Sequence, residues 1–167
     1  KKVGGMNLEE RLARLEAIEA IRQLKSHYLA ACDAKDPAAM RACFCDGPVH
    51  IDYGVLGQFS DADTVVRLYT EQACHPHILE RHHGSTPQIE LVAPTQARGS
   101  WSLHYQQINT ETNMLTQLGA IYNDEYRLTP QGWKISATVC EQKSTLVLNL
   151  GDERVLAVVR GHLPDMA

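Results

Sequence analysis

The segments ARGSWSLHYQQI (97–108), MLTQLGAIYNDEYRL (114–128) and WKISATVCEQKSTLVLNL (133–150) decide the fold of this chain. Each is long and carries β-branched and aromatic residues, the composition that strands favour. The connections between them are short and contain the turn-forming residues Asn, Thr, Pro and Gly. Consecutive strands joined by short turns pair as an antiparallel meander, and long strands twist and curl. The C-terminal half is therefore predicted to be a curved antiparallel sheet.

The N-terminal half is predicted to be mainly helical. Asn7 and Glu10 have the spacing of a capping box, and apolar residues then recur at helical spacing over residues 8–33, with no glycine or proline in between. Asp36 and Pro37 form a second helix start. Beyond the long helix we expect a short helix, a strand, a third helix and another strand, over residues 37–44, 49–53, 60–74 and 88–92. Helices followed by strands give an α+β class.

Composition and charge exclude several classes of protein. The chain has 167 residues, 44% of them hydrophobic and 22% charged, which predicts one globular domain. A net charge of -4 does not indicate a surface that binds nucleic acid. No apolar run reaches the roughly 18 residues that a membrane helix needs, and no signal peptide is expected. Five cysteines in no disulfide pattern are typical of free thiols in a reducing compartment, so we expect a cytoplasmic protein.

The chain is predicted to divide into three parts. Residues 1–5 have the composition of an expression-tag remnant, residues 6–150 form the domain, and residues 151–167 form a C-terminal extension with an apolar run at 155–159. We expect this extension to cover the mouth of a pocket or to pack on a neighbouring subunit. A helix laid across a curled sheet leaves a funnel between the two, which is a common place for a ligand pocket.

Three motifs, in the right order, resemble the NTF2-like superfamily and within it the SnoaL-like, scytalone-dehydratase-like branch. They are IRQLKSHYLAACD (21–33), RHHGSTPQIEL (81–91), and GAIYNDEYR (119–127) followed by GWKI (132–135). The resemblance covers residues 7–150. It implies an NTF2-like cone, in which N-terminal helices pack on a strongly curved antiparallel sheet, and a homo-oligomer, either a trimer or a dimer.

The resemblance also implies a catalytic pair, in which Asp33 orients His82 as the general base or acid. A neutral histidine can accept a substrate proton near neutral pH, and a carboxylate on its other nitrogen fixes the tautomer. His82 and His83 are adjacent, so in a strand they point to opposite faces and one alone enters the pocket. The match counted from Gly84 favours His82, with His83 as the alternative.

Tyr28 matches a tyrosine that polarises a carbonyl or holds a leaving group in some relatives. It is also on the apolar stripe of its helix, so a place in the ordinary core is the alternative. Tyr28 and Asp33 are about 140° apart around an ideal helix, and both face one pocket only if the helix bends or ends first.

Further candidates line the expected funnel. Trp101 and Tyr105 share one strand face and would form an aromatic wall, and Tyr53 comes from an earlier strand. His83 and His104 complete the substrate-binding candidates, although His104 points away from Trp101 unless a bulge shifts the register.

No metal or cofactor is expected. The segment CHPH (74–77) has ligand-like side chains, but no second cluster at metal-site spacing accompanies it. The sequence contains no phosphate loop, no dinucleotide fingerprint and no nucleophile elbow.

Three classes of function remain. The first is a cofactor-free lyase of the dehydratase type that acts on a mostly apolar cyclic small molecule, such as a polyketide, steroid or aromatic metabolite. An isomerase or a cyclase would use the same base. The second is a non-catalytic ligand-binding or oligomerisation module, and the third is the small subunit of a ring-hydroxylating oxygenase, against which a complete His–Asp pair argues. A pocket that brings Asp33 and His82 into hydrogen-bond contact favours the enzyme.

Overall fold

The computed structural model describes residues 6–151 and 154–160. Residues 1–5, where we expect a tag remnant, lie outside the described residues. The helices are α1 (Leu8–Asp33), α2 (Pro37–Ala42), the short 3-10 helix η1 (Gly54–Leu56) and α3 (Ala62–Ala73). The strands are β1 (His50–Asp52), β2 (Gln58–Phe59), β3 (Ile78–Ala93), β4 (Gln96–Asn109), β5 (Met114–Thr129), β6 (Gly132–Asn149) and β7 (Arg154–Arg160).

The helices begin where the capping residues predicted. The Asn7 side chain accepts a hydrogen bond from the Glu10 backbone, and the Glu10 carboxylate accepts one from the Asn7 backbone. Asp36 caps α2 by accepting a hydrogen bond from the Ala39 backbone N–H, and Pro37 follows it at the start of the helix. These local contacts satisfy N–H groups that a helix start leaves without partners.

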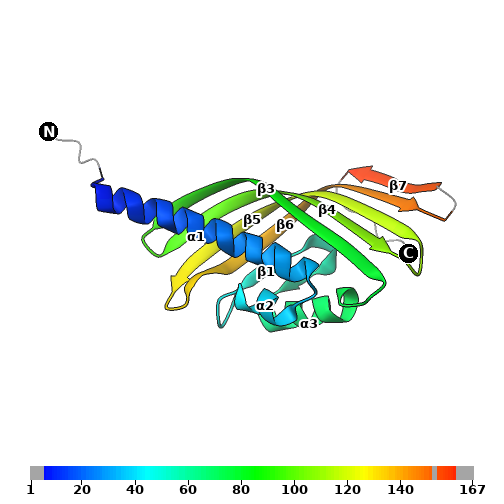
Figure 1. The fold of residues 1–167 in the computed structure, drawn as a ribbon, viewed down its shortest axis with the longest axis horizontal. Coiled ribbons are helices and arrows are strands. Elements are labelled where there is room, and N and C mark those ends of the chain that lie inside the picture. Colours follow the sequence, from blue (N-terminus) through cyan, green and yellow to red (C-terminus); the bar gives the residue numbers. More distant parts are fainter. Residues whose placement is uncertain (1–5, 152–153, 161–167) are drawn as a thin grey trace.

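The strands form one sheet in the order β2-β1-β6-β5-β4-β3, and β7 pairs with β6 outside this path. The predicted meander is present, since β3 to β6 pair antiparallel in sequence order. Among the described strands, the one parallel pair is β1 with β6. Figure 1 shows α1 lying across the curved sheet, with α2 and α3 gathered below its C-terminal end. The predicted α+β class, with N-terminal helices on a strongly curved antiparallel sheet, is confirmed.

β3 differs from the prediction. It begins at Ile78 and not at residue 88, so the sequence 81–87 lies inside a strand. Glycine and proline are common strand breakers, but the chain passes Gly84 and Pro87 through an irregularity between Ser85 and Gln88, with Thr86 in the left-handed region at φ 47°. A bulge bends a strand without ending it, and pairing with β4 resumes beyond it.

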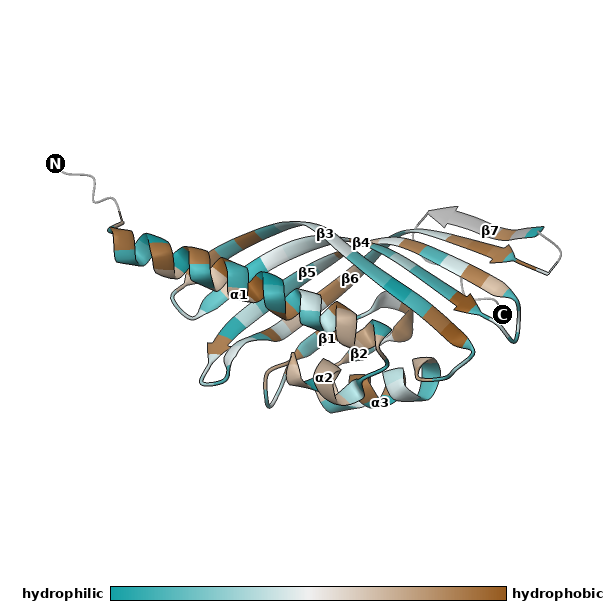
Figure 2. Cartoon of the chain, in the orientation of Figure 1, coloured by the Kyte–Doolittle hydropathy of each residue, from teal (hydrophilic) through white to brown (hydrophobic). Residues whose placement is uncertain are grey.

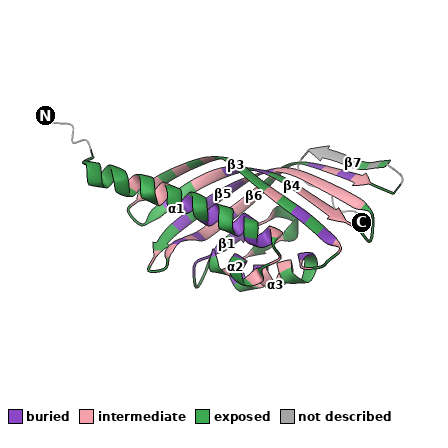
Figure 3. Ribbon diagram, in the orientation of Figure 1, coloured by how far each residue is buried: buried purple, intermediate pink, exposed green. Residues whose placement is uncertain are grey.

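The core lies between the C-terminal half of α1 and the inner face of the sheet. Ile21, Tyr28 and Ile135 are almost fully buried there, and α1 contacts β3, β6 and α2. The N-terminal half of α1 is different, because it extends past the sheet (Figure 1) and is largely exposed (Figure 3). Apolar bands nevertheless continue along this exposed half (Figure 2).

β7 is part of the expected C-terminal extension. It pairs antiparallel with Ser144–Asn149 of β6, the edge of β6 that β1 leaves open after residue 139. Whether the extension covers the pocket or a subunit interface remains a prediction, and residues 161–167 lie outside the described part of the chain.

Candidate active site

A cavity of about 340 Å³ opens between the end of α1, α3, η1 and the inner faces of β3 to β6. This size lies at the lower end of the range for small-molecule pockets. Most of the surface that lines the cavity is apolar, and Met40, Val65, Leu68, Leu103 and Leu118 contribute to it. The polar groups on the wall therefore decide how a ligand is oriented.

Asp33 and His82 meet at this cavity. His82 lines it, and its Nδ1 lies 2.7 Å from Oδ1 of Asp33. The backbone N–H of His82 donates to the same carboxylate at 3.1 and 3.3 Å. The side chains of both residues are 12% exposed. Asp33 is the last residue of α1, so the end of the helix delivers the carboxylate directly to β3.

The contact fixes the state of both groups. Burial raises the pKa of Asp33, but the hydrogen bonds from the His82 ring and backbone, and then the charges of His82 and Arg81, outweigh it and lower the pKa below its ordinary value. An ionised carboxylate only accepts hydrogen bonds, so Nδ1 of His82 carries the proton. Nε2 is then the ring nitrogen that can accept a proton.

Tyr28 and Tyr53 form the second polar group in the cavity. Both line it, and their hydroxyl oxygens are 2.6 Å apart. Burial, and then the nearby Tyr53, raise the pKa of Tyr28 well above its ordinary value, so it stays a neutral hydroxyl. When one hydroxyl donates to the other, the second keeps its own O–H for a ligand. Asp33 is still within α1 and is not among the residues that line the cavity, so Tyr28 faces the cavity directly while Asp33 reaches the site through its contact with His82.

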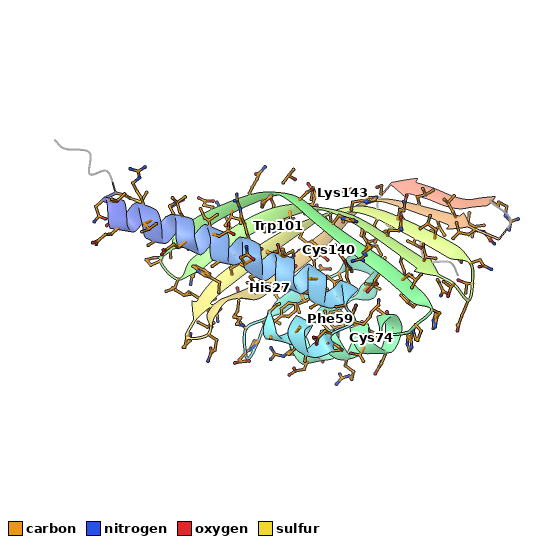
Figure 4. All side chains as sticks on the ribbon, viewed as in Figure 1. His27, Phe59, Cys74, Trp101, Cys140 and Lys143 are labelled. Carbon is orange, nitrogen blue, oxygen red and sulfur yellow. The ribbon has the colours of Figure 1, made fainter. Side chains whose placement is uncertain are left out.

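Tyr105 lines the cavity as predicted, with its ring centroid 4.7 Å from that of His82. Trp101, labelled in Figure 4, does not line this cavity. Its side chain is 6% exposed and belongs to the core, where Nε1 donates to the Tyr126 hydroxyl at 2.9 Å. Trp101 and Tyr105 share a strand face, but they are four residues apart, about 14 Å along a strand, and packing fills the funnel at the level of Trp101.

His83 and His104, the other substrate-binding candidates, do not line this cavity either. They pair across β3 and β4, with ring centroids 6.3 Å apart, and both are exposed. Since neighbouring residues of a strand face opposite ways, the inward position of His82 turns His83 outward. No bulge in this part of β4 shifts His104 to the inner face.

The sequence analysis missed two ionic groups near the cavity. Glu80 lines it and pairs with Lys35, whose Nζ lies 2.7 Å away. Behind the Tyr122 wall, Lys25 and Asp124 form a fully buried ion pair at 2.8 Å, and the Lys25 ammonium lies 3.6 Å from the Tyr122 ring centroid. Two-residue alternation from His82 would have placed Glu80 on the inner face, but no sequence signal pairs Lys25 with Asp124.

The cavity cysteines are unsuited to nucleophilic catalysis. Cys32 on α1 and Cys140 on β6 both line the cavity. Cys140 is labelled in Figure 4. Burial raises the pKa of Cys32 to about 12 and that of Cys140 to about 11. The thiolate is the reactive form, so both side chains act as small apolar wall groups at neutral pH.

Within residues 6–151 and 154–160, no group of three or more His, Cys, Asp or Glu side chains has the geometry to hold a metal ion. In the same ranges, no helix is long and apolar enough to span a membrane.

Comparison with known proteins identifies the family. The family model described as the SnoaL-like domain matches residues 13–139, so the chain belongs to the SnoaL-like family, as the motifs predicted. A proposed scytalone dehydratase from Novosphingobium aromaticivorans has a similar structure, with a TM-score of 0.74 and 17% identity over 93% of this chain and 97% of that one.

Two further solved structures are similar. The LinA-type3 hexachlorocyclohexane dehydrochlorinase from Novosphingobium barchaimii gives a TM-score of 0.72 at 19% identity, covering 92% of this chain and 99% of that one. LinA gives 0.74 at 20% identity, with coverage of 92% and 99%. At these identities the likeness establishes the shared fold, and the predicted NTF2-like cone is confirmed.

Proposed function

We propose that this protein is a cofactor-free lyase of the dehydratase type that acts on a mostly apolar cyclic small molecule. The observation that carries the proposal is the 2.7 Å contact between His82 Nδ1 and Asp33 Oδ1 on the wall of a largely apolar cavity. The names of the similar structures, a scytalone dehydratase and hexachlorocyclohexane dehydrochlorinases, are those of eliminating enzymes and support the same class of reaction.

In the proposed reaction, Nε2 of His82 removes a proton from a carbon next to a carbonyl group. The Asp33 carboxylate stabilises the imidazolium that forms. The hydroxyl pair of Tyr28 and Tyr53, 2.6 Å apart, donates to the carbonyl oxygen as negative charge develops on it. The electron pair of the broken C–H bond then forms the new double bond. The leaving hydroxyl takes the proton back from His82 and departs as water.

A panel of hydroxylated cyclic ketones, assayed for loss of water, tests the proposal. His82→Ala and Asp33→Asn are expected to lower kcat/KM by about 10²–10⁴-fold, the range for a general base. His83→Ala is the matched control, because it removes an adjacent but exposed imidazole, and it should leave kcat/KM unchanged. Full activity in both dyad variants would end the proposal. A double-bond shift without water loss would indicate an isomerase, and binding without turnover a binding module.

A further inference from the structure

Glu80 is a carboxylate on the cavity wall for which the elimination has no use. The residue is 8% exposed and lines the cavity. It precedes His82 by two residues on β3, so both side chains point to the same face, with their Cα atoms about 7 Å apart. Burying a carboxylate is unfavourable unless it is paired or hydrogen-bonded, so its surroundings are informative.

Three side chains hold the Glu80 carboxylate in place. The Lys35 ammonium lies 2.7 Å from Oε1, and the Tyr69 hydroxyl, which also contacts the Cys32 carbonyl oxygen, lies 2.8 Å from it. The Tyr105 hydroxyl donates to Oε2 at 2.9 Å. Burial and the nearby Glu80 raise the pKa of both phenols, so they stay protonated. The Tyr105 O–H donates to Oε2, whereas the single Tyr69 O–H is shared between the Cys32 carbonyl oxygen and Oε1.

The backbone conformation of Lys35 also supports a role for its ion pair with Glu80. Lys35 follows the end of α1 in the left-handed region, at φ 57°. Glycine is the usual residue at such a position, because a side chain makes this conformation unfavourable. A lysine is found here instead, and its ammonium reaches Glu80. The chain thus accepts local strain at the position from which a cation can face this carboxylate.

The cluster leaves one acceptor position free. Each carboxylate oxygen can accept two hydrogen bonds. In the part of the chain that the structure describes, Oε2 of Glu80 accepts one, from Tyr105. The Tyr105 hydroxyl itself already donates to Glu80 and accepts from Gln107 Nε2 at 3.0 Å. Glu80 Oε2 is therefore an acceptor with remaining capacity on the cavity wall.

We propose that Glu80 is the specificity-determining residue of the pocket and that it selects uncharged ring compounds bearing a hydroxyl group, which donates to Oε2. The inference rests on the proposed function only in requiring that the pocket binds a small molecule. A carboxylate cannot donate a hydrogen bond and repels anions, so ligands that offer an ether or a carboxylate at this point bind more weakly. The ligand hydroxyl that donates to Glu80 lies beside Glu80, two residues along β3 from His82.

Equilibrium titrations with three naphthalene derivatives test this proposal. They are 2-naphthol, 2-methylnaphthalene, in which a methyl group replaces the hydroxyl, and 2-naphthoate, an anion. The wild-type protein should prefer 2-naphthol. In Glu80→Gln the preference for 2-naphthol over 2-methylnaphthalene should fall by about 10-fold, because a neutral amide oxygen accepts a hydrogen bond more weakly than a carboxylate. Binding of 2-naphthoate should rise, because Lys35 then lacks its counter-charge.

Two control variants separate Glu80 from its surroundings. Thr116→Val removes another polar side chain of the cavity wall and should keep the wild-type preference. Tyr105→Phe frees a further acceptor position on Oε2 and should keep or increase the preference, which also decides the matter if Glu80→Gln does not fold. An unchanged preference in folded Glu80→Gln, a loss of preference in Tyr105→Phe, or no preference in the wild type would each overturn the proposal.

The same titrations distinguish this inference from the proposed function. The preference for 2-naphthol over 2-methylnaphthalene is a binding property that the wild-type protein shows whether or not it removes water from a ketone. If that preference is present while no compound of the ketone panel loses water, the elimination fails and the selection by Glu80 stands. If water is lost but the preference is absent, the elimination stands and the selection by Glu80 fails.

Discussion

At the scale of single residues, the site depends on buried charges whose partners come from distant parts of the chain. Asp33 and His82 are 49 residues apart in sequence and 2.7 Å apart in space. Lys25 and Asp124, at 2.8 Å, are both inaccessible to solvent. In each pair one partner comes from α1 and the other from a strand. Such pairs fix the position of the helix on the sheet.

The lowered pKa of Asp33 predicts a pH-dependent contribution to stability. The unfolded residue titrates near pH 3.9, and above that pH the carboxylate is ionised in both states, so its contribution is fully present. The contribution is lost as the pH falls through the lower folded-state pKa. Urea unfolding of wild type and Asp33→Asn should therefore show a stability difference at pH 7 that shrinks below about pH 4. A difference that grows on acidification would contradict the assignment.

Removal of Lys25 should destabilise the fold strongly. Lys25→Met leaves the Asp124 carboxylate, which also accepts from Tyr126 and Thr138, buried without its cation. We expect a loss of about 3–5 kcal/mol in the free energy of unfolding, measured with urea. Lys143→Met is the control, since its pair with Glu141 is about half exposed and should change the stability by less than about 1 kcal/mol. Equal effects of the two variants would contradict this account.

At the scale of elements, the contact between α1 and β3 brings the catalytic pair together. Gly84 lies on β3 opposite Leu29 of α1, and a Cβ at Gly84 would lie 2.6 Å from Cδ1 of Leu29. The glycine therefore allows the helix to approach the strand closely. This close approach explains the glycine at the end of the RHHG motif. Gly84 follows His82, the histidine that Asp33 contacts, by two residues.

Gly84→Val is expected to cost about 1–3 kcal/mol of stability, because it overpacks this contact, and to weaken the hold of α1 on His82. Chemical denaturation measures the cost. Leu29→Ala in the same chain should relieve part of it, so that the double variant is more stable than the sum of the single changes predicts. Strict additivity of the two substitutions would show that the two side chains do not meet.

At the scale of the whole molecule, curvature creates the cavity. The sheet curls around the end of α1, and α2, η1 and α3 close the open side (Figure 1). The opposite end of α1 has no such cover. Leu8, Leu12 and Leu15, spaced along one side of the helix, are 76%, 53% and 64% exposed, an apolar stripe that is typical of a subunit contact.

We therefore expect a homo-oligomer, a trimer or a dimer, in which this stripe is buried. Sedimentation equilibrium at micromolar concentration measures the mass. Leu12→Glu combined with Leu15→Glu should yield a folded monomer, because two charges would be buried at the interface. Leu128→Glu, on a strand and 40% exposed, should keep the wild-type mass. A monomeric wild-type protein would contradict the expectation.

Much of the candidate site was predicted from local and family patterns. Residues 8–33 form the expected helix because its cap and periodicity are encoded within a few turns, and the meander follows from turn residues between long apolar strands. The motifs gave Asp33, His82 and Tyr28, and alternation along a strand gave Tyr105. The start of β3 was not predicted because Gly84 and Pro87 are equally compatible with a loop and with a bulged strand.

The sequence by itself determined the class of fold, the family and the identity of the His–Asp pair, since these depend on periodicity, capping and ordered motifs. Only the tertiary structure decided which inward-facing residues line a cavity and which are core. Trp101 and Tyr105 share a strand face, yet the filling of the funnel separates them. The pairing of Glu80 with Lys35 is also a tertiary result, because two charges attract according to their distance in space, which the folded chain alone defines.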